Sequence, residues 1–441
     1  MKQSKHNIYY SPKEVRTILE RSIDTALDGL KGYCNDPVSD FTRCRKLPAR
    51  TLIECIMSFS NYSSIGELSH FFAGQGEMPS ASALSQRRQL LDPDIFKRIN
   101  NLFVSAFDDH TTINGYHILA QDGSDVNIPF MDDKTKTEKH DAKSFCQYHV
   151  NALYDCLNKV FYDWSIDAAS KKREVNALIS ILKDRNYPHN SIFTADRGYE
   201  SYNLMAHFIE NDIKFVIRVK DIHTKSGLMT NIKTEEGAFD MRVNRTLTSL
   251  QTKEIKADKE KYIFVPTTSN FDFLDENRDF YDLSFRAVRF KISEDTYETV
   301  VTNLSEEEFK TEDFKELYHY RWNEETAFNK LKYTIGLVYF HARKRKLIQQ
   351  EINAAFLMYN VSEVIIRNID LKKNKKPELE YDYKPNFSSA VTNIRLYLRK
   401  KISMKELILR IKKFLVAQRP ERSFERNIKG QSCKPLNYRT S

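Results

Sequence analysis

The feature that most constrains the fold is an alternation of short β-rich runs and helical segments between residues 113 and 220. The β-rich runs lie at 116–121, 191–195 and 213–219. Helices are predicted between them, at 173–185 and 200–211. Such alternation is typical of an α/β layer. The first two runs end directly before Asp122 and Asp196, and Asp122-Gly-Ser124 is expected to be a turn.

Glycine is scarce, with 12 residues in 441. The chain has no Gly-x-Gly-x-x-Gly sequence, because its single Gly-x-Gly, at Gly74 and Gly76, has Pro79 where the third glycine would stand. It also lacks a Gly-x4-Gly-Lys-Ser/Thr loop. These absences argue against a classical dinucleotide-binding fold and against a Walker-type NTPase.

Composition also indicates the compartment. No run reaches the eighteen or so apolar residues that a membrane span requires, and the polar N-terminus lacks an apolar signal core. The six cysteines are scattered without a Cys-x2-Cys pair, which favours free thiols in a reducing compartment over disulfides or a zinc site. We therefore expect a soluble, cytoplasmic protein without a membrane partner.

Positive charge is concentrated in the final hundred residues. The net charge is +9, but residues 342–441 hold 24 Lys and Arg against 9 Asp and Glu, while residues 1–341 hold 45 against 51. Such a region suits nucleic acid or another polyanion. A solvated, lysine-rich helical tail would have the same charge, and charge alone does not separate the two interpretations.

The N-terminal region, residues 12–110, is predicted to be helical. A helix that begins after Pro79 carries Gln86, Arg87 and Arg88 near its middle. A short helix with such a polar face suits a DNA contact of the helix-turn-helix kind. A plain helical bundle with surface arginines explains these residues equally well, so both interpretations stay open.

The regions after residue 220 are predicted from their composition and from the pattern of their apolar residues. Residues 221–283 are polar, rich in Thr and Lys, and predict a β-rich insertion without a helix. Strands are expected again at 284–292 and 297–302. From Thr311 the chain is predicted to be mostly helical, beginning with one helix over 311–332.

A hairpin is predicted from the runs 149–154 and 160–166. His149 lies in its first strand. His117 lies in the preceding strand and is interpreted as a core or edge residue and not as a ligand. Neither His140 nor His149 has a partner at a spacing that would make a metal site.

The helix predicted over 311–332 places four polar side chains on one stripe. At about 100° per residue, Tyr318, Arg321 and Lys332 lie within roughly 40° of Glu325. Local i,i+4 pairing of Arg321 with Glu325 is the simpler explanation, and contributes only about a few tenths of a kcal/mol. That pairing does not account for Tyr318 and Lys332 on the same stripe.

This stripe resembles the YREK signature of DDE transposases encoded by bacterial insertion sequences. The matching residues are Tyr318-x2-Arg321-x3-Glu325-x6-Lys332. The sequence around Asp122 is similar to that family's first acidic motif, and the sequence around Asp196 is similar to its second. The resemblance covers about residues 40 to 345, with the insertion the least matched part.

The resemblance implies an α/β, ribonuclease-H-like catalytic core with a β-rich insertion, flanked by helical regions at both ends. The expected divisions are an N-terminal helical, DNA-end-binding domain at 1–112, a first part of the core at 113–220, the insertion at 221–283, a second part of the core at 284–345, and a basic C-terminal helical region at 346–441 that dimerises or contacts DNA.

The resemblance also implies that Asp122, Asp196 and Glu325 are both the catalytic and the metal-binding residues. Three carboxylates brought together repel one another, and a divalent cation relieves that repulsion. Oxygen ligands suit Mg2+, with Mn2+ as a substitute, and argue against zinc. Two such ions can activate an attacking oxygen and stabilise the leaving oxygen of a phosphodiester.

DNA-binding roles are implied for the remaining residues of the signature. Arg321 can hold a phosphate through two hydrogen bonds, and Lys332 can add a point charge nearby. Tyr318 can hydrogen-bond a phosphate or stack beside a distorted end nucleotide.

The function implied is that of a bacterial transposase. It would cut double-stranded DNA at the inverted-repeat ends of its element with Mg2+ and join them to target DNA, as a synaptic homodimer and through a hairpin intermediate. It would be associated with the nucleoid when bound to DNA. A catalytically silent DNA-binding derivative is the main alternative, and a two-metal nuclease without strand transfer is another.

Overall fold

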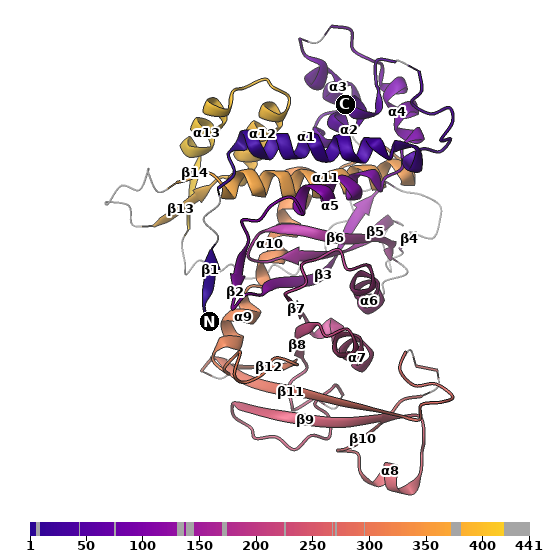
Figure 1. The fold of residues 1–441 in the computed structure, drawn as a ribbon, viewed down its shortest axis with the longest axis vertical. Helices are drawn as coiled ribbons and strands as arrows, with labels where there is room; N and C mark the ends of the chain where they lie inside the picture. Colours follow the sequence, from indigo (N-terminus) through magenta and orange to yellow (C-terminus); the bar gives the residue numbers. More distant parts are fainter. Residues whose placement is uncertain are drawn as a thin grey trace.

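The computed structural model describes residues 1–5, 9–43, 45–74, 76–129, 136–137, 145–169, 174–224, 226–266, 268–269, 271–294, 296–371 and 381–418. These residues form an elongated molecule (Figure 1). A layer of helices lies at one end, a mixed sheet runs through the middle, and a long β-ribbon forms the other end.

The sheet has ten strands among the described residues. Its spatial order is β10 (Tyr262–Phe264), β9 (Phe239–Thr248), β11 (Phe280–Ser293), β12 (Thr296–Thr302), β8 (Lys214–Val219), β7 (Ser191–Ala195), β3 (His117–Ile128), β5 (Phe145–Asp155) and β4 (Lys136–Thr137), with β6 (Val160–Ala168) paired to β5. β3, β7 and β8 are mutually parallel, whereas β5, β6, β11 and β12 pair with antiparallel neighbours.

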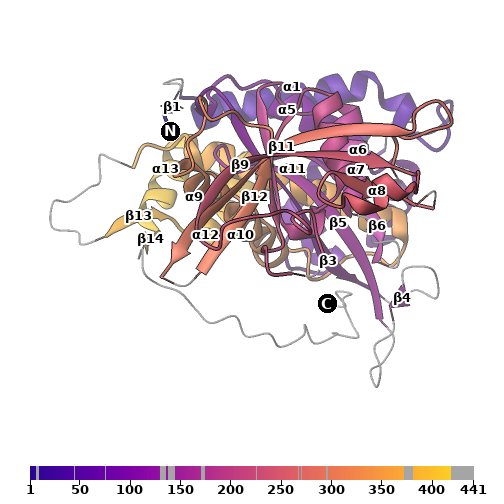
Figure 2. The same ribbon diagram turned by 90° about the horizontal axis from the view of Figure 1, so that it is seen from below.

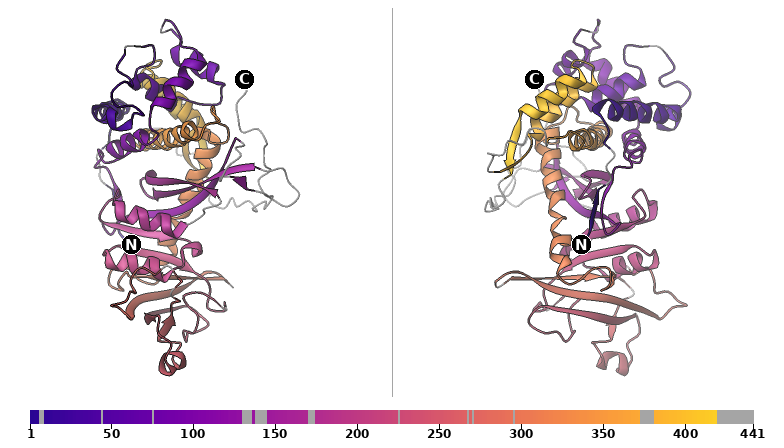
Figure 3. Two further views of the ribbon diagram at one scale, coloured as in Figure 1. Left: turned by 90° about the vertical axis from the view of Figure 1, so that its right-hand side faces the viewer. Right: turned by 60° about the vertical axis from the view of Figure 1, so that its left-hand side comes forward.

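Helices cover both faces of the central strands. α6 (Glu174–Asp184) and α7 (Tyr202–Glu210) lie on one face, and α10 (Trp322–Lys330) lies on the other (Figure 3). Every residue of β7 is therefore buried, which explains its continuous apolar run. This arrangement confirms the predicted α/β layer.

The region predicted as an insertion is β-rich, and it extends the central sheet instead of standing apart from it. β9 pairs with β11 along ten residues, from Phe239–Arg289 to Thr248–Phe280. β11, in turn, continues through β12 into the core (Figure 2). The prediction missed the short helix α8 (Lys253–Ala257) and placed the start of β11 four residues too late.

The helices at the two ends of the chain pack against each other. The N-terminal helices are α1 (Pro12–Asp28), η1 (Leu30–Tyr33), α2 (Ala49–Met57), α3 (Ser64–Phe72), α4 (Ala81–Leu90) and α5 (Ile95–Val104). α11 (Arg345–Arg367) packs against α1, α2 and α5 and rests on β6 (Figure 1). The division of the chain at residues 112 and 346 stays a prediction.

The remaining elements are β1 (Gln3–Lys5), β2 (Thr111–Ile113), α12 (Phe387–Leu398), α13 (Met404–Lys413), β13 (Asp382–Pro385) and β14 (Leu415–Gln418). Among the helices described, none combines the length and the apolar composition that crossing a membrane would need.

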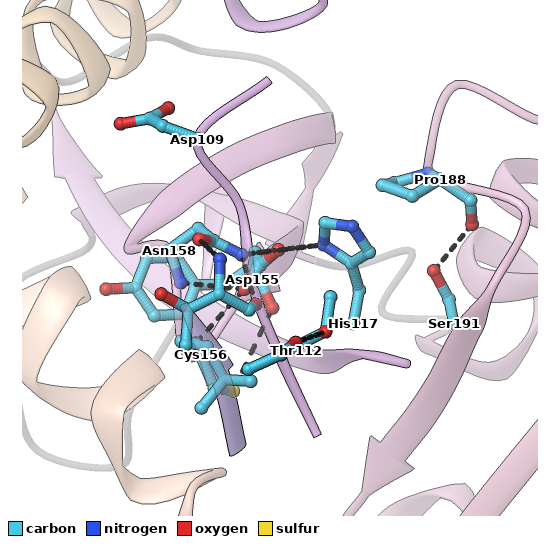
Figure 4. A network of polar contacts seen from close by, with 12 residues as sticks. Asp109, Thr112, His117, Asp155, Cys156, Asn158, Pro188 and Ser191 are labelled. Carbon is cyan, nitrogen blue, oxygen red and sulfur yellow. Dashed lines mark hydrogen bonds and ion pairs between the residues drawn. The ribbon is translucent and has the colours of Figure 1, made fainter. Parts of the chain in front are cut away.

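His117 lies at the start of β3 and is buried, as predicted for a core residue. Its Nδ1 lies 2.7 Å from Oδ2 of Asp155, at the end of β5 (Figure 4). Asp155 also accepts hydrogen bonds from the backbone and side-chain nitrogens of Asn158, at 2.8 and 2.9 Å. The turn of the predicted hairpin is thereby tied to β3, the strand that carries Asp122.

Arg88 is buried, whereas both interpretations of this helix expected its arginines on the surface. Its side chain is only 3% exposed, and Nη2 lies 2.8 Å from Oε1 of Glu351 on α11. The other oxygen of Glu351 lies 3.0 Å from Nδ1 of His341. Burial opposes ionisation of Glu351, but Arg88 and His341 lower its pKa to about 2.

The neighbours of Arg88 have different surroundings. Arg87 is half-buried, and its Nε donates to the carbonyl of Leu47 at 3.1 Å. Gln86 is exposed. The arginines of α4 thus hold the helical layer together, which the sequence pattern alone left open.

We expect Arg88→Met to lower the free energy of unfolding by about 3 kcal/mol, because it leaves the buried Glu351 carboxylate without its main counterion. Urea denaturation followed by circular dichroism measures this change. The exposed Arg21 on α1 provides the control, since Arg21→Met should change stability by less than about 0.5 kcal/mol. Equal effects of the two substitutions would contradict the structural role of Arg88.

Candidate active site

Asp122 and Asp196 lie side by side on neighbouring parallel strands. The pairing of β3 with β7 ends at Gln121 and Ala195, and the next residue of each strand is the aspartate. Asp196 then begins the short helix η3 (Arg197–Tyr199), and its Oδ1 accepts a hydrogen bond from the backbone N–H of Gly198 at 2.8 Å. The two acids therefore lie together where the pairing of β3 with β7 ends.

The chain does not turn after Asp122, so the predicted turn is wrong. β3 continues to Ile128 because β5 pairs with it throughout, with Asp122 opposite Ala152 and Gly123 opposite Asn151. An Asp-Gly sequence is typical of turns, but the hydrogen bonds of β5 hold it in an extended strand.

Glu325 reaches the same edge from the opposite layer. It lies on α10, which packs against β3. Arg321 stands between the two acids, with Nη1 3.6 Å from Oδ2 of Asp122 and Nη2 3.2 Å from Oε1 of Glu325. The simple i,i+4 pair is thus present, and Arg321 also joins the helix to the strand.

The single helix predicted over 311–332 is wrong. The segment forms α9 (Asp313–His319), α10 and the π-helix η4 (Leu331–Ile335). Around Arg321 the backbone makes i,i+3 hydrogen bonds, from the N–H of Arg321 to Tyr318 and from the N–H of Glu324 to Arg321. Such tightening rotates one helical segment against the next, so a regular 100° stripe does not describe these residues.

Tyr318 and Lys332 nevertheless lie near the acids. Tyr318 is buried, and the Arg321 Cζ atom lies 5.8 Å from the centre of its ring. The Tyr318 hydroxyl has no hydrogen-bond partner among the residues described. Burial lowers the pKa of Lys332, and the carboxylates of Asp125 and Asp122 oppose this shift.

Asp122 is held in an unfavourable charge state. Burial raises the pKa of its carboxyl to about 6, and the negative charges of Asp196 and Glu325 add to the rise. The N–H of Gly123 and the Arg321 guanidinium act in the opposite direction. A further cation placed beside Asp122 would therefore lower the pKa of its carboxyl and favour the ionised form.

A second group of charged residues lies on the other face of β3, and sequence reasoning missed it. His149 is fully buried, with Nδ1 2.7 Å from Oδ1 of Asp125 and Nε2 3.1 Å from Oε1 of Glu174. The signal was present in part, because Asp125 and His149 are directly opposed on β3 and β5. His140 lies outside the described residues.

Glu324 is a further acid of α10, and the helical pattern did not indicate it. It is fully buried beside Glu325, and burial together with the charge of Asp122 raises its pKa well above the ordinary value. Its position on the core side of α10 distinguishes it from Glu325, whose side chain is 23% exposed.

The donor chemistry of the edge fits a hard divalent cation, because Asp122, Asp196 and Glu325 offer only carboxylate oxygens. Across the described residues, no three His, Cys, Asp or Glu side chains are arranged as a preformed metal site. The reason is visible at Arg321, whose buried guanidinium already supplies positive charge to two of the three acids.

We expect Asp122→Asn to raise the free energy of unfolding by about 2 kcal/mol at pH 8. The folded-state pKa of about 6 exceeds the ordinary 3.8, so the ionised carboxylate destabilises the fold above pH 6. The gain should shrink as the pH falls from 6 toward 4 and should vanish below the ordinary pKa of 3.8, where Asp122 is protonated in both states. Thermal or urea unfolding in the presence of EDTA tests this, with the exposed Asp184→Asn as control. A gain that is the same at pH 8 and pH 4 would refute the assignment.

Comparisons with known proteins identify the family of this chain. Residues 113–361 match the family model described as "Transposase DDE domain". No curated protein is significantly similar in sequence. A solved structure, "Cryo-EM structure of piggyBac transposase synaptic complex with hairpin DNA", is similar with a TM-score of 0.47 and 12% identity, over 96% of this chain and 90% of that chain. The family match spans more than half of the 441 residues and includes every acid described above, so the chain belongs to the transposase DDE domain family.

Proposed function

We propose that this protein is the transposase of an insertion sequence. It cleaves double-stranded DNA at the element's terminal inverted repeats and joins the freed 3′ ends to target DNA. Asp122, Asp196 and Glu325 are the catalytic and metal-binding residues. The observation that carries the proposal is that the buried Arg321 contacts both Asp122 of β3 and Glu325 of α10, while Asp196 directly follows β7, the parallel neighbour of β3. All of these residues lie inside the family match.

The three acids account for the hydrolytic and transfer steps together. Their carboxylates would hold Mg2+, with Mn2+ as a substitute, and two such ions when bound supply activation of the attacking oxygen and stabilisation of the leaving oxygen. Water is the attacking group in cleavage, and the 3′-OH is the attacking group in strand transfer. Neither step needs a covalent protein intermediate.

Arg321, Lys332 and Tyr318 would bind the DNA end beside these acids. Arg321 is 5% exposed, and its Nε and Nη1 have no hydrogen-bond partner in the part of the chain described. A phosphate oxygen can accept from these donors and so replace the carboxylates as the partner of Arg321. Binding of a DNA end would then release Asp122 and Glu325.

The proposal also includes the oligomeric state of the protein and the intermediate of the DNA reaction. A synaptic homodimer brings two element ends together, and a hairpin intermediate on the element end follows from the resemblance of the Tyr318–Lys332 motif. The basic residues after 342 would contact DNA or the second subunit.

Replacing each acid by its amide should abolish Mg2+-dependent cleavage while DNA binding is kept, because the amides lose the charge that binds the cation. The variants are Asp122→Asn, Asp196→Asn and Glu325→Gln. The assay uses a plasmid with the gene's own flanking DNA, with and without Mg2+, followed by mapping of the breaks.

The exposed Glu312, just before α9, gives the matched control, since Glu312→Gln should cleave as the wild type does. Cleavage by all three amide variants would show that the catalytic residues are misassigned. Wild-type protein that binds the flanking DNA with strong salt dependence but never cuts it would indicate a silent DNA-binding derivative.

Arg321→Gln and Lys332→Gln should each weaken binding to the DNA ends and reduce the slope of log affinity against log salt by about 1, because each removes one phosphate contact. Fluorescence anisotropy at several salt concentrations measures the slope. The exposed Lys310→Gln is the control. An unchanged slope in both variants would contradict the phosphate roles.

A further inference from the structure

We propose that Glu174 is a fourth carboxylate of the cation-binding edge, and that His149 and Asp125 are the residues that position it. This inference rests on the proposed function, because it adds a residue to the same site. It is drawn from the contacts on the α6 face of β3, which the three-acid description leaves unexplained.

Glu174 is the first residue of α6, and α6 packs against β3, β5 and η3. Its carboxylate therefore lies where the Asp122 strand and the Asp196 turn meet. A methyl group built onto Gly198 would lie 2.9 Å from Oδ1 of Asp196 and 3.6 Å from Oε2 of Glu174. Two carboxylates thus face the same glycine of the Asp196 turn.

The absence of a side chain at Gly123 allows this approach. A Cβ atom at Gly123 would lie 2.3 Å from Nε2 of His149 and 3.0 Å from Oε1 of Glu174. The distance to His149 is shorter than real Cβ contacts allow, and the distance to Glu174 is tighter than most of them. Glycine is therefore needed after Asp122 so that the side chains of His149 and Glu174 can approach the β3 backbone closely. The backbone at this glycine is an ordinary strand.

His149 fixes the orientation of Glu174. Both ring nitrogens face carboxylate oxygens, with Asp125 on one side at 2.7 Å and Glu174 on the other at 3.1 Å. The ring is fully buried in β5, whereas the Glu174 side chain is 27% exposed. Carboxylates that bind metals are commonly held in place by neighbouring polar side chains, and His149 lies where it can hold Glu174 in this way.

The catalytic edge is thus built from two similar units on opposite faces of β3. On the α10 face, the buried Arg321 bridges Asp122 and Glu325. On the α6 face, the buried His149 bridges Asp125 and Glu174. In each unit a buried, nitrogen-bearing side chain lies between two carboxylates whose side chains are 23% to 38% exposed. Glu174 can therefore supply oxygen ligands to a cation from the face that Glu325 does not reach.

The test is Mn2+ binding by the full-length protein in the presence of the gene's flanking DNA, measured from the electron paramagnetic resonance signal of free Mn2+ and corrected with the same DNA alone. Glu174→Gln keeps the size of the side chain and a hydrogen-bonding partner for His149 but removes the charge. We expect it to weaken Mn2+ binding about tenfold. Asp184→Asn, at the far end of α6, removes the same charge and should leave binding unchanged.

The positioning role of His149 has its own readout. His149→Gln should weaken Mn2+ binding when Glu174 is present and have no further effect in the Glu174→Gln background, since it acts through that residue. Thermal unfolding checks that each variant is folded. If His149→Gln does not fold, Glu174→Asp is the second test of how Glu174 is positioned. This variant keeps the charge but shortens the side chain, so it should bind Mn2+ less tightly.

The outcomes separate the two proposals. Wild-type Mn2+ binding in Glu174→Gln, together with weaker binding in Asp122→Asn, Asp196→Asn and Glu325→Gln, would overturn the role of Glu174 and leave the proposed function standing. Unchanged binding in all four variants would overturn the proposed function itself. Additive effects of His149→Gln and Glu174→Gln would overturn the positioning role alone.

Discussion

Carboxylates from a strand and from a helix can lie close together here because the buried Arg321 guanidinium stands between them. Without that cation, Asp122 and Glu325 would repel each other across the interface of β3 and α10. The repulsion is offset only in part, since burial and the neighbouring acids still raise the pKa of Asp122. The site thus keeps unfavourable charge inside a stable fold, as expected where function and stability compete.

The parts of the site that the sequence predicted are those that depend on local spacing. Asp122 and Asp196 follow apolar runs that form neighbouring parallel strands, and Glu325 lies one helical turn after Arg321. The place of each aspartate after a strand and the spacing of Glu325 from Arg321 can be read locally, and the family resemblance gave these acids their role. Their meeting at one edge then follows from the general behaviour of parallel strands in α/β layers.

The parts that could not be predicted depend on partners far along the chain. β3 passes through an Asp-Gly sequence because β5 supplies hydrogen bonds, and Arg88 is buried because Glu351 lies opposite it. Glu174 gains its place only once α6 has packed against Gly123 and the Asp196 turn. In each case a tertiary contact overrides the local preference on which the sequence argument depended.

The position of α11 has a consequence for how the protein is made. Arg88 and Gln350, which are hydrogen-bonded in the finished protein, are separated by 262 residues. Because synthesis proceeds from the N-terminus, the first five helices leave the ribosome long before α11 exists, and their apolar faces must wait for it. A truncated nascent chain therefore cannot complete its helical layer, even when it already carries all three acids. Completion of the helical layer thus depends on a part of the chain that is synthesised only after residue 344.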